Sequence, residues 1–424
     1  MKVTAANCIN LDFDKIKEAK SWNKEVSNEL KMHKIHVYPA KFPSFLISKS
    51  INYARINDIN IQTIGDIFCG CGTTALEAKR NGVNFWGCDI NPVATLITKV
   101  KTEFYNEKLL LRYYQLITEK FQTINLIVPK KINDHERINF WFEKCQIKKL
   151  YTLQEIIKAS TPKGKYQNFF LVAFSNILKG ASKWLTKSIK PTIDKNKEIK
   201  DVERLFRIQF NLMLKASIEY NNKITNKTQT TIVTNNFLGT KINKTLVDLL
   251  ITSPPYVTSY EYADLHQLSL LWLGYTNDFR TLRNGTIGSV YHQEISDESI
   301  ENDVNDIGKG IYADLVRAKK SKAKSVAKYF IDIKKSVRKS YSIINNGGLA
   351  VYVIGNTKYK NVYVDNAKYI TKCMFDSGFK EVEVLKRSIS SKILSPYRDA
   401  DGKFSNDKRK RKVYNCEFIL IAKK

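Results

Sequence analysis

A glycine-rich turn between a predicted buried strand and a predicted helix is the feature that most restricts the fold of this chain. Residues 61–68 form an apolar run typical of a buried strand, and Cys69-Gly70-Cys71-Gly72-Thr73-Thr74 follows it. Residues 75–80 have helical character, and residues 85–90 indicate a second strand. This order predicts a parallel βαβ unit, and therefore an α/β fold with helices on both faces of the sheet.

The glycine turn suits a nucleoside-like ligand. Gly70 and Gly72 let the backbone approach a ligand closely, and the helix that follows presents free N–H groups. Asp89 lies about twenty residues on, where nucleotide-binding folds place a carboxylate on ribose hydroxyls. The third glycine of a dinucleotide fingerprint would fall at Ala75, and no lysine follows the turn to hold phosphates. These departures favour a nucleoside without a pyrophosphate.

A second motif follows another predicted strand. Residues 247–251 form a short apolar run, and Ser253-Pro254-Pro255-Tyr256 comes at its carboxyl end, where open α/β sheets bind ligands. Neither proline has an N–H group, and each fixes its φ angle. The carbonyl groups of Ser253 and Pro254 therefore form a rigid array of hydrogen-bond acceptors.

Such an array suits a planar exocyclic amine, such as N4 of cytosine or N6 of adenine. If the Ser253 hydroxyl and the Pro254 carbonyl accept its two hydrogens, the nitrogen is drawn towards tetrahedral geometry and its lone pair is freed for attack. Tyr256 offers a flat face on which an extruded base can stack. A proline-rich turn that only caps a strand is the alternative interpretation.

Together the two motifs resemble those of the S-adenosylmethionine-dependent amino-group DNA methyltransferases, especially the cytosine-N4 type with its Ser-Pro-Pro-Tyr signature. Three further blocks match in order: residues 36–43 before the glycine turn, 87–92 after it, and 268–274 after the catalytic turn. The resemblance implies a Rossmann-like methyltransferase sheet with helices on both faces, a C-terminal β-hairpin and a mainly helical insertion. It also implies S-adenosylmethionine as the cofactor and double-stranded DNA, with one base extruded, as the substrate.

The resemblance assigns residues to the site. The implied cofactor contacts are Tyr38, Phe42, Asp66, Phe68, Gly70, Gly72, Thr73, Thr74, Asp89 and Ile90. The implied catalytic residues are Ser253, Pro254, Pro255 and Tyr256. Core packing is the alternative role for the aromatic residues 38 and 42. The family often has an acid near the adenine ring of the cofactor, where this chain has Asn235-Asn236, so the resemblance implies no acidic contact there.

Composition indicates a globular protein with a polyanionic partner. The chain has 424 residues, of which 43% are hydrophobic and 11% aromatic, enough to build a core. Its formal net charge is +29, which favours nucleic acid as a partner. A coding bias towards lysine would not by itself reduce the acidic residues to 41 against 70 basic ones.

Cysteine and histidine patterns predict neither disulfides nor a metal. The seven cysteines are an odd number without a C-x-x-C pair, and His33 and His36 have no accompanying ligand cluster. No Pro-Cys dipeptide occurs, so the nucleophile signature of cytosine-C5 methyltransferases is missing. The first twenty residues have no apolar segment, and no stretch reaches membrane-spanning length. We therefore predict a cytoplasmic protein of bacterial or archaeal type with no membrane partner.

The motifs divide the chain into three parts. Residues 1–99 are the N-terminal part of the methyltransferase domain, with the cofactor motifs, and residues 231–424 are the C-terminal part, with the catalytic motif. Residues 100–230 are predicted to be a helical insertion, with helical periods at 109–121, 145–159, 168–184 and 202–220. One order class of the family places its target-recognition region here. A cap or a dimerisation surface is the alternative role.

The C-terminal part contains further candidate segments. Tyr262 and His266 share a helix face and could line a base pocket or belong to the core. Residues 279–294, with Arg280 and Arg283, suit a basic loop over the substrate. Residues 311–342 predict one long basic helix stopped by the glycines of 345–348, and the run at 408–412 favours phosphates.

These patterns predict a site-specific DNA methyltransferase that acts on N4 of cytosine, in a restriction-modification or defence context with a cognate restriction endonuclease as a partner. Adenine N6 is an open alternative, because the choice of base depends on Ser253 alone. An RNA amino-group methyltransferase and a non-catalytic nucleic-acid-binding protein are two further alternatives. The oligomeric state is not predicted.

Overall fold

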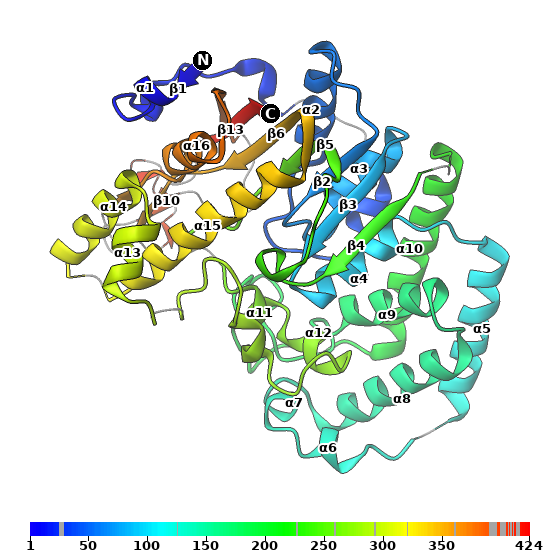
Figure 1. Ribbon diagram of the computed structural model, residues 1–424. Helices are drawn as coiled ribbons and strands as arrows, with labels where there is room; N and C mark the ends of the chain where they lie inside the picture. Colours follow the sequence, from blue (N-terminus) through cyan, green and yellow to red (C-terminus); the bar gives the residue numbers. More distant parts are fainter. Residues whose placement is uncertain are drawn as a thin grey trace.

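A mixed eight-stranded sheet lies at the centre of the computed structural model (Figure 1). The structure describes the chain except residues 25–28, 125, 226–227, 258–259, 292–293, 320, 360–361, 390–396, 399–403, 406, 408, 410 and 413–415. The strand order is β1-β9-β13-β6-β5-β2-β3-β4. These strands are β1 (Lys2–Thr4), β2 (Thr63–Asp66), β3 (Asn84–Asp89), β4 (Thr230–Thr234), β5 (Val247–Thr252), β6 (Ile344–Ile354), β9 (Glu381–Ser388) and β13 (Cys416–Lys423).

The sheet has a parallel part and an antiparallel part. Strands β6, β5, β2, β3 and β4 are parallel neighbours, whereas β13 pairs antiparallel with both β6 and β9, and β1 with β9. The predicted α/β fold with a C-terminal hairpin is confirmed, and it is consistent with a Rossmann-like methyltransferase fold. Because β2, β3, β4 and β5 are parallel, their carboxyl ends meet at one edge of the sheet.

Two small groups of strands lie outside the main sheet. Strands β7 (Thr357–Tyr359) and β8 (Val362–Val364) form a hairpin. Strands β10 (Tyr397–Arg398), β11 (Phe404–Ser405) and β12 (Arg411–Lys412) pair within the connection between β9 and β13. Of the predicted basic run at 408–412, residues 408 and 410 lie outside the described residues.

Helices cover both faces of the sheet, because alternate side chains of the buried strands point to opposite faces. Along β6, Ala350 and Tyr352 enter the core beneath α14 (Asp306–Arg317), α15 (Ala323–Ile343) and α16 (Asn366–Ser377). Val351 and Val353 enter the core beneath α2 (Ser44–Ile56) and α3 (Thr73–Arg80).

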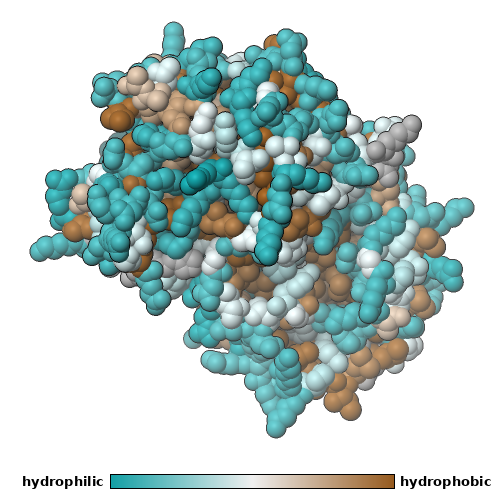
Figure 2. Space-filling model, in the orientation of Figure 1, coloured by the Kyte–Doolittle hydropathy of each residue, from teal (hydrophilic) through white to brown (hydrophobic). Residues whose placement is uncertain are grey.

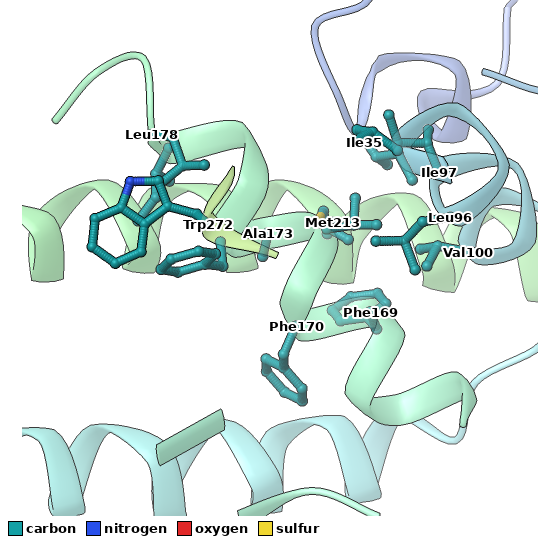
Figure 3. Close-up of a cluster of buried hydrophobic side chains, with 14 of the residues drawn as sticks. Ile35, Leu96, Ile97, Val100, Phe169, Phe170, Ala173, Leu178, Met213 and Trp272 are labelled. Carbon is teal, nitrogen blue, oxygen red and sulfur yellow. The ribbon is translucent and has the colours of Figure 1, made fainter. Parts of the chain in front are cut away.

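The helices between α4 (Pro92–Lys101) and β4 form a third core with α4 and α12 (Gln267–Trp272). They are α5 (Glu107–Thr123), α6 (Lys130–Asn133), α7 (Glu136–Trp141), α8 (Lys144–Ser160), α9 (Lys165–Ile177) and α10 (Val202–Lys223). In Figure 3, Phe169 of α9 and Met213 of α10 lie beside Leu96 and Val100 of α4. These helices are thereby packed onto the helix that follows β3.

Shorter helical segments complete the described structure: α1 (Ala5–Cys8), α11 (Tyr262–Leu265), α13 (Asp297–Asp303), η1 (Phe13–Lys15), η2 (Lys20–Trp22), η3 (Lys31–Lys34), η4 (Phe237–Gly239) and η5 (Phe279–Arg283). Within the described residues, no helix is long and apolar enough to cross a membrane. Figure 2 shows one face of the molecule, and hydrophilic side chains cover most of it.

The prediction of one helix over residues 311–342 is wrong. Helix α14 ends at Arg317 and α15 begins at Ala323. Lys319 between them adopts a left-handed φ of 51°, and its N–H donates to the Val316 carbonyl at 2.8 Å. Lysines of α15 pair with nearby acids, for example Lys324 with Asp297 at 3.3 Å. These pairs agree with a solvated face for this charge run.

Helix α15 ends at Ile343, which agrees with the predicted stop of the helix by residues 345–348, but these residues themselves belong to β6. A Cβ atom on Gly348 would lie 2.7 Å from the Asp248 carbonyl oxygen of β5. Asn345 donates to the Asp248 carboxylate at 2.7 Å, next to a register shift between Val247 and Leu249. The glycine therefore allows two strands to approach closely.

Two glycines of α14 give a matched test of this packing. A Cβ atom on Gly308 would lie 2.5 Å from Val304 Cγ1 and 2.7 Å from Tyr369 Cε2, whereas one on Gly310 would meet no heavy atom within 4 Å. We expect Gly308→Ala to lower the free energy of unfolding by about 1–3 kcal/mol through overpacking. Gly310→Ala should raise it by about 1 kcal/mol through helix propensity. Urea unfolding of both variants measures this, and changes of the same sign would contradict it.

Candidate functional site

The glycine turn links β2 to α3 at the carboxyl edge of the sheet. Gly70 and Gly72 have positive φ angles of 49° and 77°. A Cβ atom on Gly72 would lie 2.5 Å from Thr98 Cγ2, so a side chain there would displace α4. The Thr98 hydroxyl also donates to the Gly70 carbonyl at 2.9 Å, which holds the turn against α4.

Asp66 ends β2 and points inward. It is 2% exposed, and its carboxylate accepts from Thr74 Oγ1 at 2.7 Å, Thr252 Oγ1 at 2.7 Å and the Phe68 N–H at 3.1 Å. Burial raises the pKa of Asp66 to about 7, against the lowering effect of these three donors. Asp66 therefore connects the glycine turn to Thr252, the residue that precedes Ser253. Thr74 and the Phe68 backbone donate to the Asp66 carboxylate from the side of the glycine turn.

Asp89 ends β3 and is partly exposed. Its Oδ2 accepts from the Gly70 N–H at 2.8 Å, and its Oδ1 accepts from the Asn91 N–H at 2.8 Å. Each oxygen therefore has one protein donor and can accept another hydrogen bond. Burial raises the pKa of Asp89 to about 6. This arrangement fits a pair of ribose hydroxyl groups.

Aromatic rings cover the glycine turn. The Tyr38 ring stacks on His266, with centroids 4.9 Å apart, and lies 6.3 Å from the Tyr262 ring. A Cβ atom on Gly70 would lie 3.6 Å from the Tyr38 ring. His266 is also within 3.0 Å of the Asn91 side chain, so Tyr262 and His266 lie on the Asp89 side of the edge.

Three other predicted cofactor residues have different surroundings. Phe42 packs against the core cluster of α2, which agrees with its alternative role in core packing. Ile90 lies under the segment after η5, because a Cβ atom on Gly285 would lie 3.3 Å from Ile90 Cδ1. Thr73, at the start of α3, is 2% exposed, and its hydroxyl has no hydrogen-bond partner among the described residues. This buried hydroxyl and the open glycine turn fit a polar ligand.

The catalytic turn follows β5 directly. Ser253 Oγ donates to the Val353 carbonyl of β6 at 3.0 Å, so its single proton is committed and its lone pairs can accept hydrogen bonds. Pro254 is buried, while Pro255 and Tyr256 are partly exposed. The Tyr256 hydroxyl donates to Glu417 Oε1 at 3.0 Å. The turn is thus anchored to the antiparallel part of the sheet.

The segment after η5 crosses the carboxyl edge between the two turns. The Asn236 side chain donates to the Gly285 carbonyl at 3.1 Å, and a Cβ atom on Gly288 would lie 3.6 Å from the Tyr256 carbonyl oxygen. The Arg283 side chain donates to the Asp264 carboxylate at 2.7 Å and so has a partner within the protein. Arg280, the other arginine that the sequence suggested, bonds Asp278 at 2.9 Å, so this segment contacts the edge through its backbone rather than through its arginines.

Buried polar groups behind the glycine turn were missed by the sequence reasoning. Lys101 is fully buried, and its Nζ donates to Cys71 Sγ at 3.4 Å. His33 lies 2.8 Å from Glu77 Oε1, and His36 lies 3.0 Å from Ser175 Oγ. The two histidines therefore have separate protein partners. No sequence signal marks Lys101 as buried, since its position on α4 reads as a helix end.

The buried carboxyl of Asp66 predicts a dependence of stability on pH. A carboxyl whose pKa is raised by folding binds its proton more tightly in the folded protein, so its contribution is present below about pH 4 and is lost as the pH rises through about 7. Asp66→Asn does not titrate. We expect the variant to gain stability relative to wild type between pH 4.5 and 8, by on the order of 1.4 kcal/mol per unit of displaced pKa.

Urea unfolding of both proteins across this range measures the difference. Asp89 and Asp365, whose pKa values burial also raises, are present in both proteins, so their titration cancels. A difference that does not vary with pH would show that Asp66 does not titrate in this range.

Comparison with known proteins gives one family match and two relatives. Residues 11–100, which contain the glycine turn, match the family model described as DNA methylase. The chain is 21% identical over 415 residues to the type II methyltransferase M.MvaI of Kocuria varians, covering 92% of this chain and 90% of that protein. It is 28% identical over 243 residues to the type II methyltransferase M.BsoBI of Geobacillus stearothermophilus, covering 50% and 47% of the two chains. The fold and these matches support an amino-group DNA methyltransferase.

Proposed function

We propose that the protein transfers a methyl group from S-adenosylmethionine to the exocyclic N4 of cytosine in double-stranded DNA. The observation that carries this proposal is the hydrogen bond from Ser253 Oγ to the Val353 carbonyl. Because the hydroxyl proton is already donated, Ser253 can only accept from a further partner. An exocyclic amine, which offers two N–H donors, matches that requirement.

The residues of the catalytic turn have separate roles in this proposal. Ser253 Oγ and the Pro254 carbonyl accept the two amine hydrogens and draw the nitrogen lone pair out of the ring system. Tyr256 stacks on the extruded base. Pro255 holds the turn by fixing its φ angle. The nitrogen would attack the methyl carbon in line while the bond from that carbon to the donor sulfur breaks, which leaves S-adenosylhomocysteine. The methylated nitrogen would then release its extra proton to solvent, so no covalent enzyme intermediate is needed.

The glycine turn would hold the methyl donor beside the amine. S-adenosylmethionine supplies an electrophilic methyl group, and the DNA methyltransferase family implies its use. The Asp89 carboxylate would accept from the ribose hydroxyls, since each of its oxygens has a spare acceptor position. Tyr38 would close the cofactor side, because its ring lies against the glycine turn.

The choice of cytosine N4 over adenine N6 depends on Ser253, which begins the Ser-Pro-Pro-Tyr motif. The two bases present equivalent amines to the acceptor pair, so the chemistry proposed for the turn serves either one. An RNA amino group is a further candidate substrate, and a non-catalytic nucleic-acid-binding protein is the alternative of another class. Both relatives are described as type II methyltransferases, which favours DNA and a restriction-modification context with a cognate endonuclease.

We further propose that residues 100–230 read the target sequence. The inserted helices share a core with α4 and α12, and these helices carry or follow residues of the site. A DNA contact on the insertion would therefore be held at a constant position relative to Asp89 and His266. A cap or a dimer contact is the alternative role for the same helices.

Nucleoside analysis tests the proposed function. DNA that lacks methylation is incubated with the protein and labelled S-adenosylmethionine, digested, and analysed by mass spectrometry. We expect label in N4-methylcytosine. Label in N6-methyladenine would keep the mechanism and overturn the base, label found only in RNA would overturn the substrate, and no label in either would favour the binding protein.

Removal of the Ser253 hydroxyl tests the acceptor role. We expect Ser253→Ala to lower kcat by about a hundredfold, because a directed hydrogen bond at the reacting atom contributes on this scale. Ser342→Ala is the control, since Ser342 is exposed and its hydroxyl donates to the Lys339 carbonyl of its own helix. Methyl transfer to DNA is measured for both variants. Full activity in Ser253→Ala would remove the hydroxyl from the mechanism.

Removal of the Tyr256 ring tests the stacking role. We expect Tyr256→Ala to lower kcat/KM for DNA by about ten- to a hundredfold, because stacking of a base on an aromatic ring contributes about 1–3 kcal/mol. Binding of S-adenosylhomocysteine, measured by calorimetry, should persist, since the glycine turn is unchanged. Loss of this binding together with activity would instead indicate a general disruption of the edge.

A further inference from the structure

The hydroxyl of Tyr256 is held by a buried ion pair. Tyr256 donates to Glu417 Oε1 at 3.0 Å, and Glu417 Oε2 accepts from Arg387 Nε at 3.0 Å. Arg387 and Glu417 face each other across β9 and β13. Their side chains are 4% and 15% exposed. The antiparallel hairpin therefore supplies a charged acceptor to a residue that lies over 160 positions earlier, at the end of β5.

Close packing against Gly355 also restricts the orientation of the Tyr256 ring. A Cβ atom on Gly355 would lie 2.9 Å from Tyr256 Cε2, so the ring packs against a position that only glycine leaves open. The Arg387 guanidinium in turn lies 5.3 Å from the centroid of the Phe45 ring of α2. Gly355, which follows β6, and Glu417 of β13 thus contact the hydroxyl end of Tyr256, and Phe45 contacts the arginine behind Glu417.

The buried Arg387–Glu417 ion pair is not well explained as a contribution to the stability of the fold. Taking two charges out of water costs free energy that often exceeds their attraction, and apolar residues of similar size would fill the same space. The pair does provide one thing that apolar residues cannot, which is an acceptor at a defined position. Burial and the neighbouring Glu417 raise the pKa of Tyr256 well above its usual value, so the hydroxyl keeps its proton and donates.

We propose that Glu417 and Arg387 are positioning residues that orient the Tyr256 ring for stacking on the target base. The inference rests on the proposed function. A ring held in its stacking orientation before DNA arrives loses less conformational entropy when the base enters. Glu417 acts on Tyr256 through the hydroxyl, and Arg387 acts through Glu417, so neither side chain needs to touch the base.

Tyr256→Phe is the primary test, because it keeps the ring and leaves the Glu417–Arg387 pair intact. We expect kcat/KM for unmethylated DNA to fall about tenfold, as for the loss of one hydrogen bond to a charged group. The dissociation constant of S-adenosylhomocysteine should stay within about twofold of wild type. Tyr53→Phe is the matched control, since Tyr53 also donates to a glutamate near the hairpin, Glu383 of β9.

A double-mutant cycle with Glu417→Gln separates positioning from structure. If the carboxylate acts through the hydroxyl, Glu417→Gln lowers kcat/KM in wild type but changes it by less than about twofold in the Tyr256→Phe background. A purely structural role would lower the melting temperature in both backgrounds and add to the loss of activity.

The outcomes separate this inference from the function on which it rests. A wild-type protein that transfers no methyl group to DNA or RNA overturns the proposed function, and the inference with it. An active wild type whose kcat/KM is unchanged in Tyr256→Phe, or additive losses in the cycle, overturns the inference alone. An equal loss of activity in Tyr53→Phe would also overturn it, because that change lies away from the catalytic turn.

Discussion

The hydrogen bonds of the Asp66 carboxylate unite the two halves of the site. Thr74 belongs to the glycine turn and Thr252 precedes the catalytic turn, 186 positions later than Asp66 in the sequence. Their hydroxyls meet on one buried carboxylate because β5 lies beside β2 in the sheet. Methyl transfer requires the donor and the amine to be aligned within a few tenths of an ångström to an ångström. A shared buried acceptor keeps the two turns at a constant separation.

The elements that the sequence predicted well have local signals. The strand, glycine turn and helix of residues 61–80 are marked by apolar periodicity and by glycines, and the structure has β2 and α3 there. The break between α14 and α15 has no such signal, because the left-handed residue is Lys319 rather than a glycine. The glycines of residues 345–348 were predicted only to end a helix, and α15 does end at Ile343, but Gly348 also allows close packing of β6 on β5.

The sequence marks the two turns of the candidate site but not the residues that hold those turns in place. Ser253 and Tyr256 stand out because prolines separate them after an apolar strand. Their anchors, the Val353 carbonyl and Glu417, lie 100 and 161 positions away, and only the sheet topology brings them together. The same holds for the stack of Tyr38 on His266. Contacts of this kind depend on which strands become neighbours, and a single sequence carries no direct record of that.

Unused hydrogen-bonding capacity separates the residues that support the site from those suited to a ligand. Asp66 is buried and already accepts from three protein donors, so it is suited to holding the two turns. Asp89 is partly exposed and accepts from two, and Ser253 has given its only proton to the sheet. The ligands that satisfy these remaining acceptors must bring donors. Ribose hydroxyls at Asp89 and an exocyclic amine at Ser253 meet that requirement at the same edge of the sheet.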